Sequence, residues 1–425
     1  MITLVPLECS LLILNHLRHK NLLSCALVSR PWCKLIIPIL WCDPKHHFQD
    51  ERLINTLLLM LSPEERTLVD NFNVQIPNNQ PVLEYTNFIT YVTRDLYNGV
   101  RCWITSRQEA GVGTAFEDLI NYSLIRLLLR TGKNLRYIFL EELNCNYIVF
   151  KNTTITSLDL YFSDEIHHRD VSKSIEGLIK NINGNTTLTT LNIILSFLGE
   201  GLKALTKALC KNNAINSFSI HQLRLNKGRG RMLRGFLRKN TTITSLSLCR
   251  SPFKNGTVPE LGKSLAVGLR INKTLKHLKV QYYNFGSEEG RLLADVLYTN
   301  TTLLSLDLVI IFIRQQGEQA LAEALCKNTT LMSFNLHNNF IKLEEGQILA
   351  DVLCKNTTLI SLDLSHNNLR LKGGKALAKA FFNTSLIDLN LENNNIGFKG
   401  ENALEKALKD ACHENIKLTS LKLQV

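Results

Sequence analysis

Leucine recurs along this chain in a nine-residue pattern, Asn-x-Thr-Leu-x-x-Leu-x-Leu, with copies beginning at Asn300, Asn328 and Asn356, where Phe334 replaces one leucine. The copies are 28 residues apart, and the alternating end of each predicts a short strand with one apolar face. Such a strand cannot cover its own leucines, so this period predicts a solenoid of stacked units. The anchor asparagine recurs at Asn152, Asn185, Asn212, Asn240, Asn272, Asn300, Asn328, Asn356, Asn383 and Asn415.

The second half of each unit has helical spacing. In residues 319–326 and 347–354, apolar side chains recur at i, i+3 and i+4, which predicts one helix per unit. The expected fold is an α/β solenoid, a horseshoe with inner parallel strands and outer helices. It resembles the ribonuclease-inhibitor type of leucine-rich repeat, and the resemblance covers residues 134–425, about ten repeats.

The repeats differ at the ninth position counted from the first leucine. Asn339, Asn367 and Asn394 occupy it in the last full units, whereas Ile311 stands there in an earlier one. An asparagine side chain both donates and accepts hydrogen bonds, so we expect a ladder of bonds to turn backbone in the last units and an interruption at Ile311.

Residues 1–42 predict a compact helical module rich in leucine and isoleucine. Two interpretations stay open: an apolar cap for the solenoid, or a surface for a partner that covers the leucines so short a segment cannot bury. The spacing resembles the F-box family pattern, with mild departures at Val5 and Asn21. The matching residues are Pro6, Glu8, Ile13, Leu14, Leu17, Leu22, Val28, Arg30 and Trp32.

The F-box resemblance implies a partner, the Skp1 adaptor of a cullin-RING ubiquitin ligase. It implies that this chain is a substrate-recognition adaptor of an SCF (Skp1–cullin–F-box) ligase in ubiquitin-dependent protein degradation, with the concave face of the repeats binding a protein substrate. By position, the Skp1-binding residues or their support are Pro6, Leu7, Ile13, Leu14, Leu17, Leu22, Val28 and Trp32. The alternative is a repeat scaffold or sensor without a ligase role.

Residues 43–133 are expected to form a mainly helical spacer or amino-terminal cap. Residues 53–61 and 119–129 have helical patterns. Residues 72–76 are expected to be extended, and Pro77 and Pro81 mark a loop.

Charge is unevenly distributed along the chain. The formal net charge is +12, yet residues 1–130 hold 12 basic and 12 acidic residues, whereas 201–280 hold 17 Lys or Arg and one acid, Glu260. About half of these cations fit a solvated helix face. Others are expected in or just beyond the inward-facing strand positions, and suggest an acidic or phosphorylated substrate: His221, Arg224, Arg250, His277 and Lys279. Nucleic acid is disfavoured because interleaved aromatic residues are few.

The sequence predicts no catalysis, cofactor or metal site. The segment 256–264 resembles a phosphate-binding Gly-x4-Gly-Lys-Ser loop, but five residues separate its glycines. The segment is therefore expected to be an ordinary repeat helix. Histidine pairs such as His46-His47 lack partners at metal-ligand spacing.

The expected compartment is the cytoplasm, the nucleus or both. Eleven cysteines include no Cys-x-x-Cys pair, so we expect reduced thiols. Residues 1–17 lack the basic start of a secretory signal, and no apolar run approaches the roughly 20 residues of a membrane span. Asn-x-Thr triplets coincide with the repeat anchors, which makes glycosylation the weaker explanation for them.

Overall fold

The structure is a computed structural model that describes residues 7–70, 72, 83–107, 114–141, 152–162, 175–180, 182–195, 201–223, 226–250, 259–341, 343–381, 384–412 and 418–423. The chain divides into two compact units. Unit 1 comprises residues 1–181 and 187–191, and unit 2 comprises residues 182–186 and 192–425.

Unit 1 is mainly helical and ends in parallel strands. Strand β1 pairs with β2, and β2 pairs with β3 with Ile138 opposite Leu158. The elements are α1 (Leu7–Asn15), α2 (His19–Ala26), α3 (Arg30–Cys42), η2 (Lys45–Gln49), α4 (Glu51–Leu58), α5 (Pro63–Asp70), η3 (Tyr85–Phe88), β1 (Tyr91–Val92), α6 (Asp95–Ser106), α7 (Thr114–Thr131), β2 (Tyr137–Glu141) and β3 (Ser157–Phe162).

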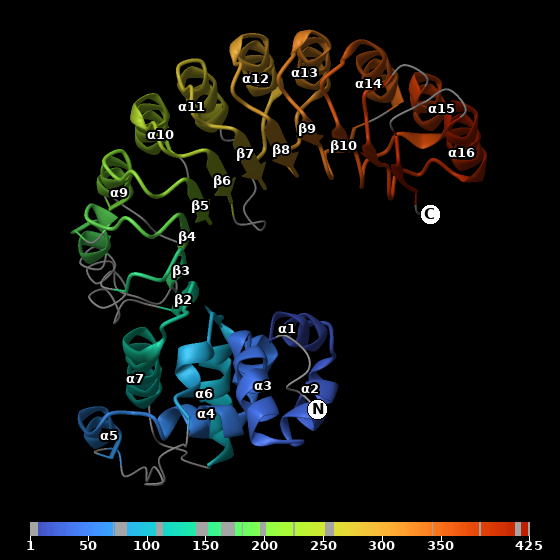
Figure 1. Cartoon of the computed structure of the whole chain (residues 1–425). Coiled ribbons are helices and arrows are strands. Elements are labelled where there is room, and N and C mark those ends of the chain that lie inside the picture. Colours follow the sequence, from blue (N-terminus) through green and yellow to red (C-terminus); the bar gives the residue numbers. More distant parts are fainter. Residues whose placement is uncertain are drawn as a thin grey trace. The chain divides into compact units, whose positions relative to one another are not determined.

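Unit 2 alternates strands and helices, and its helices lie on the convex side of the strands (Figure 1). Strand β4 (Thr190–Leu195) begins in unit 1. The following elements are α9 (Gly201–Leu209), β5 (Ser217–His221), α10 (Lys227–Lys239), β6 (Ser245–Cys249), α11 (Pro259–Leu269), β7 (His277–Gln281), α12 (Ser287–Thr299), β8 (Ser305–Val309), α13 (Gln315–Lys327), β9 (Ser333–Asn335), α14 (Leu343–Lys355), β10 (Ser361–Asp363), α15 (Arg370–Ala380), β11 (Asp388–Asn390), α16 (Phe398–Cys412) and β12 (Ser420–Lys422).

The repeat leucines form the shared core. The strands are ordered in the sheet as in the sequence, and the register places Leu278, Leu306 and Phe334 side by side on β7, β8 and β9. All three are buried, whereas the residues before and after each of them on its own strand face the opposite side of the sheet. The predicted α/β solenoid of leucine-rich repeats, with parallel strands and one helix per unit, is confirmed.

The anchor asparagines from Asn212 to Asn356 are buried and hold successive repeats together. The amide nitrogen of Asn300 donates to the Leu269 carbonyl at 2.8 Å, and its oxygen accepts from the backbone N–H groups of Thr302 and Leu303 at 3.0 and 2.8 Å. Asn240, Asn272, Asn328 and Asn356 repeat this arrangement. Each of these amide nitrogens already donates inside the fold, which supports a structural role for the triplets over glycosylation.

The second asparagine ladder is also present. Asn339 donates to the Leu308 carbonyl and accepts from the Ile311 N–H at 2.9 Å, and Asn367 accepts from the Asn339 N–H at 2.9 Å. Ile311 has no side-chain polar group to extend the ladder, although its own N–H is bonded by the following repeat.

Two boundaries differ from the sequence-based division. Strand β1 lies before residue 134 and pairs with β2, so parallel pairing begins inside the expected spacer. The division between the two compact units falls near residue 181. The helices expected at 53–61 and 119–129 correspond to α4 and α7; the extended segment and loop expected between 72 and 81 lie, apart from Phe72, outside the described residues.

Candidate functional site

The first three helices form a small core of their own. Leu14 on α1, Leu22 on α2 and Ile36 on α3 are buried together. Leu17, Cys25 and Trp32 pack partly buried against them. Helix α3 begins after Ser29, whose hydroxyl accepts from the Trp32 N–H at 3.4 Å, an N-cap that satisfies one open backbone donor.

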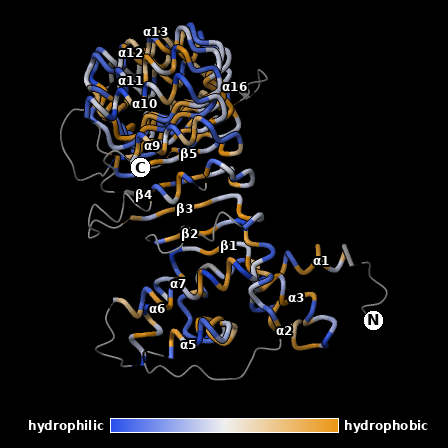
Figure 2. The backbone as a smooth tube through the Cα atoms, turned by 90° about the vertical axis from the view of Figure 1, so that its left-hand side faces the viewer, coloured by the Kyte–Doolittle hydropathy of each residue, from blue (hydrophilic) through white to orange (hydrophobic). Residues whose placement is uncertain are grey.

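A second set of large apolar side chains, on α1, α2 and the turn after α2, is exposed. We call it the head surface: Leu12, Ile13, Leu23, Leu27 and Val28. Ile13 is 60% exposed and Leu27 is 88% exposed. Orange, apolar segments run along α1 to α3 in Figure 2. Large exposed apolar side chains are typical of interaction sites when several occur together, and five fall within residues 12–28 here. This segment therefore has the composition of a binding surface.

The predicted Skp1-binding residues divide into two groups. Ile13 and Val28 are exposed, whereas Leu14 and Leu22 are 2% and 4% exposed and belong to the core. Leu17 and Trp32 are half-buried. Pro6 and the Leu7 side chain lie outside the described residues. Contact with an adaptor is therefore open to Ile13 and Val28, while Leu14 and Leu22 are placed to support the helices.

Three members of the head surface are absent from the sequence-based site: Leu12, Leu23 and Leu27. A family pattern marks positions that are regularly apolar, and these include both core and surface. Helical spacing could have identified Leu12 and Leu23 as exposed. They lie two and one positions from the buried Leu14 and Leu22, and residues so close in a helix face different directions.

The module is joined to the following part of unit 1 through α3. The Trp41 ring stacks on Tyr85 with centroids 4.4 Å apart. The carbonyl of Cys42, the last residue of α3, accepts from the Thr90 N–H at 2.9 Å. The attachment uses the end of α3, so it leaves the head surface on α1 and α2 uncovered by these contacts.

The predicted basic residues of the strand face lie on neighbouring strands of unit 2. His277 is exposed and Lys279 half-buried, and both are on the same face of β7. His221 ends β5 and Arg250 follows β6, both half-buried. Arg224 lies outside the described residues. The structure thus brings His277 and Lys279 together on one strand, with His221 and Arg250 at neighbouring strand ends.

An acidic residue borders this basic group. Lys279 on β7 is in register with Asp307 on β8. Burial raises the pKa of Asp307, and the positive charge of Lys279 opposes that rise. Asp363 and Asp388 occupy the equivalent face of β10 and β11, so the charge of this face changes sign along unit 2.

Sequence reasoning missed an aromatic group on the strands of unit 1. The Tyr91 and Tyr137 rings lie 6.0 Å apart, and the Arg94 guanidinium lies 4.9 Å from the Tyr161 ring centroid. The Tyr137 hydroxyl donates to Asp159 at 2.8 Å. Tyrosine and arginine are enriched at protein-binding hot spots. The sequence signal for this group is tyrosine at strand positions that face away from the core. Using it requires knowing that β1 pairs with β2, which the repeat pattern after residue 134 does not indicate.

One cluster superficially resembles a catalytic arrangement. The Ser365 hydroxyl is 2.5 Å from the Asp363 carboxylate and 2.8 Å from His337 Nδ1. A nucleophilic serine needs a histidine base that is itself oriented by an acid, whereas here Ser365 bonds directly to the carboxylate and is buried. The arrangement stabilises the turns after β9 and β10.

The phosphate-loop-like segment is helical in its described part. Lys263 and Ser264 lie within α11, where Ser264 is buried and Lys263 pairs with Glu288 at 3.3 Å. Among the described residues, no group of three or more His, Cys, Asp or Glu is arranged to hold a metal ion. Nor is any described helix both long and apolar enough to cross a membrane.

A known protein family matches the first helices of the chain and not the repeats. The family model for the F-box domain matches residues 2–37. No curated protein matches the chain. Because the match covers α1, α2 and most of α3, it coincides with the helices that carry the head surface.

Several solved structures resemble the chain at low identity. The Rad7–Elc1 complex in yeast is 15% identical over 71% of this chain and 72% of that one, with a TM-score of 0.48. The leucine-rich-repeat protein LegL7 from Legionella pneumophila is 18% identical over 67% and 90%, with a TM-score of 0.45. The tropomodulin C-terminal domain of Caenorhabditis elegans is 17% identical over 33% and 83%, with a TM-score of 0.29. These values are too low to transfer a function. Residues 2–37 are an F-box domain, joined in one chain to a leucine-rich-repeat solenoid.

Proposed function

We propose that this chain is the substrate-recognition subunit of an SCF-type ubiquitin ligase. F-box domains serve as adaptor modules in ubiquitin ligases, and this chain carries one at residues 2–37. In the proposed role, the head surface docks on the Skp1 adaptor and, through it, on the cullin. The chain contributes proximity between substrate and ligase and no bond-making group.

The observation that carries the proposal is the exposure of the head surface. Five large apolar side chains between residues 12 and 28 are exposed although the same helices bury a core of leucines and isoleucine. Exposed apolar area costs free energy in water, at about 25 cal/mol per Å², so a protein partner that covers it gains that amount on binding.

The substrate-binding part of the proposal concerns the inner strand face. We assign substrate contact to His277 and Lys279, with His221, Arg224 and Arg250 at its margin, and an acidic or phosphorylated segment as the ligand. The exposure of His277 supports this, and the proximity of Asp307 to Lys279 limits the net positive potential. The proposed compartment is the cytoplasm, the nucleus or both.

Co-purification with Skp1 tests the docking role. Ile13→Asp and Leu27→Asp place a charge on the head surface without touching the buried core, and each is expected to reduce Skp1 retention at least about tenfold. Phe398→Asp is the matched control, since Phe398 is an exposed apolar residue at the start of α16. Failure of the unmodified chain to retain Skp1, or equal retention by all three variants, would refute the proposal.

A further inference from the structure

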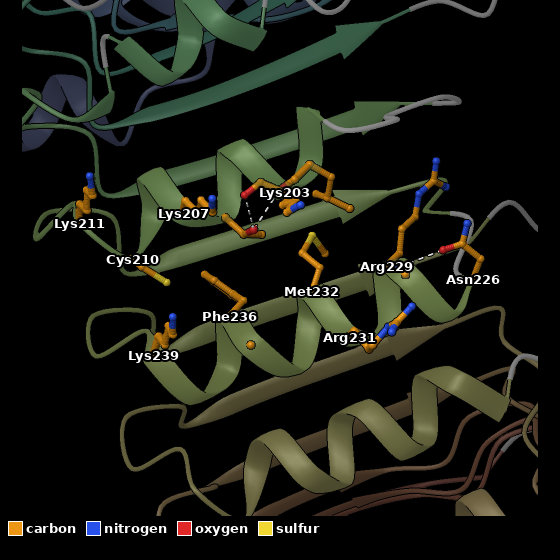
Figure 3. Close-up of a pocket in the computed structure, with 14 residues that line it drawn as sticks. Lys203, Lys207, Cys210, Lys211, Asn226, Arg229, Arg231, Met232, Phe236 and Lys239 are labelled. Carbon is orange, nitrogen blue, oxygen red and sulfur yellow. Dashed lines mark hydrogen bonds between the residues drawn. The ribbon is translucent and has the colours of Figure 1, made fainter.

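A cavity of about 980 Å³ lies between the outer helices α9 and α10 of unit 2 (Figure 3). We call it the α9–α10 groove. It is on the helix side of the repeats, whereas the proposed substrate contacts are on the strand side. Volumes of this size are typical of ligand pockets, so the groove is large enough to receive several side chains of a partner.

The walls of the groove are basic. Lys203 and Lys207 on α9, followed by Lys211, form one wall, and Arg229, Arg231 and Lys239 from α10 stand on the other (Figure 3). Neither helix contains an aspartate or glutamate. Among the described residues, Lys207, Lys211, Arg231 and Lys239 form no ion pair with an acid.

The next pair of helices, α11 and α12, is joined by ion pairs. Lys263 on α11 pairs with Glu288 on α12 at 3.3 Å, and Arg270 pairs with Asp295 at 3.2 Å. Aspartate and glutamate are missing from α9 and α10 themselves, and the carboxylate of Glu260 on α11 lies against α10 near Gly230. The six cations around the cavity therefore outnumber the acids beside it. Such a cluster raises the local concentration of anionic partners.

The floor of the groove is apolar. Leu202 and Phe236 are buried, and Met232 lies half-buried between the two walls. Phe236 packs edge-on against Phe218 of β5, with ring centroids 6.1 Å apart, which fixes the floor. The Thr206 hydroxyl bonds to its own helix at Leu202, so it does not offer the groove a free donor.

From these features we infer that the α9–α10 groove binds an acidic protein segment that carries at least one large apolar side chain. The apolar side chain packs on the half-buried Met232, and flanking carboxylates face the lysines and arginines. A free phosphate would leave Met232 uncovered. A single-stranded nucleic acid needs stacking aromatics, but the groove's one aromatic residue, Phe236, is buried.

This inference is independent of the proposed ligase role. A chain that fails to retain Skp1 could still bind an acidic segment here, and the reverse is equally possible. The two results are therefore distinguishable in separate assays.

Peptide selection on the intact chain tests the inference. A phage-displayed library of random 12-residue peptides is selected on the chain and counter-selected on Lys207→Glu/Arg231→Glu, and recovered peptides are labelled for fluorescence anisotropy. We expect acidic peptides with Leu, Phe or Trp. The double charge reversal should weaken binding by about tenfold or more, and Met232→Ser by about fivefold. The matched control Lys227→Glu/Arg238→Glu reverses two charges on α10 at residues that do not line the groove. This control should weaken peptide binding less than about twofold.

Alkylation of two thiols gives a second readout. Cys210 lines the groove, whereas Cys354 is exposed on α14. A bound peptide at about ten times its Kd should slow alkylation of Cys210 by about tenfold and leave Cys354 unchanged.

Three results would overturn the inference. The selection yields no acidic apolar peptide, the recovered peptides bind the double variant as well as the original chain, or they leave alkylation of Cys210 unaffected. Loss of binding to a 20-nucleotide probe or to anionic vesicles in that variant, with no acidic peptide bound, would assign the groove to a different class of partner. Thermal unfolding of each variant checks that it is folded.

Discussion

The anchor asparagine carries much of the specificity of each repeat at the scale of single residues. Its amide bonds to three backbone groups: two N–H groups of its own turn, and one carbonyl at the end of the helix in the preceding repeat. Buried backbone groups without partners are costly. The conserved geometry from Asn240 to Asn356 therefore fixes the distance between successive units.

Replacing one anchor tests this role. Asn300→Ala leaves two N–H groups and a carbonyl without partners, so the free energy of unfolding should fall by about 2 to 4 kcal/mol. Chemical denaturation measures the change. Asn213→Ala is the control because Asn213 is exposed beside the anchor Asn212, and it should change stability by less than about 0.5 kcal/mol. Equal effects of both substitutions would contradict the assigned role.

A second residue-scale prediction concerns pH. Burial lowers the pKa of His337; the Asp363 charge opposes this and His366 adds to it. The folded chain therefore binds this proton more weakly than the unfolded chain, whose histidine pKa is about 6.5. His337 contributes stability above that value, and the contribution is lost as pH falls through it.

The measurement is the unfolding midpoint between about pH 7.5 and about pH 5.5. His337→Gln should lose less stability over this interval than the original chain, and the two stability curves should converge toward the acidic end of it. A pH dependence as steep in the His337 variant as in the original chain would rule out this contribution.

At the scale of elements, glycine decides how closely neighbouring helices approach. A Cβ atom added to Gly290 on α12 would lie 2.6 Å from the Gly317 Cα on α13, so these helices touch through their backbones. Gly235 on α10, which borders the α9–α10 groove, has no heavy atom within 4 Å of such a Cβ. Gly290 therefore lies where two helices are in close contact, whereas Gly235 lies where the neighbouring helix is not in contact.

Alanine at the two positions should therefore act in opposite directions. Gly290→Ala forces α12 and α13 apart and should destabilise the chain by about 1 to 3 kcal/mol. Gly235→Ala meets no neighbour and should stabilise α10 by up to about 1 kcal/mol through helix propensity. Unfolding midpoints of both variants check the signs. Stabilisation by Gly290→Ala would show that the helices are not in close contact.

The extent of prediction also differs by element. The strands and helices of unit 2 could be predicted because leucine and asparagine recur with a regular period in the sequence. Strand β1 could not be found because a two-residue strand has too short an apolar alternation. The division of the F-box residues into Leu14 inside and Ile13 outside depends on helix packing that a family pattern does not encode.

The candidate sites were predicted only in part for a related reason. The basic composition of residues 201–280 was apparent, but the positions at which the cations meet depend on which helix faces oppose each other. Arg231 and Lys239 fit a solvated helix face by sequence, whereas the structure places both beside the α9–α10 groove. Similarly, the pairing of Lys279 with Asp307 arises from strand register across two repeats.

At the level of the whole molecule, the proposed function assigns docking to the F-box domain and recognition to the repeats. The F-box domain exposes apolar side chains beyond those its own core uses, and the repeats offer a strand face and a helix-side groove. The three helices of the F-box domain bury a core of their own, so a charge introduced on the head surface should leave the stability of the repeats unchanged.

Hydrogen–deuterium exchange of the intact chain with purified Skp1 measures whether the head surface is the docking site. Saturating Skp1 should slow exchange in α1, α2 and the turn after α2, which carry the head surface, and leave α10 to α16 unchanged. Unchanged exchange in α1 and α2 at saturating Skp1, or protection confined to the repeats, would contradict this assignment.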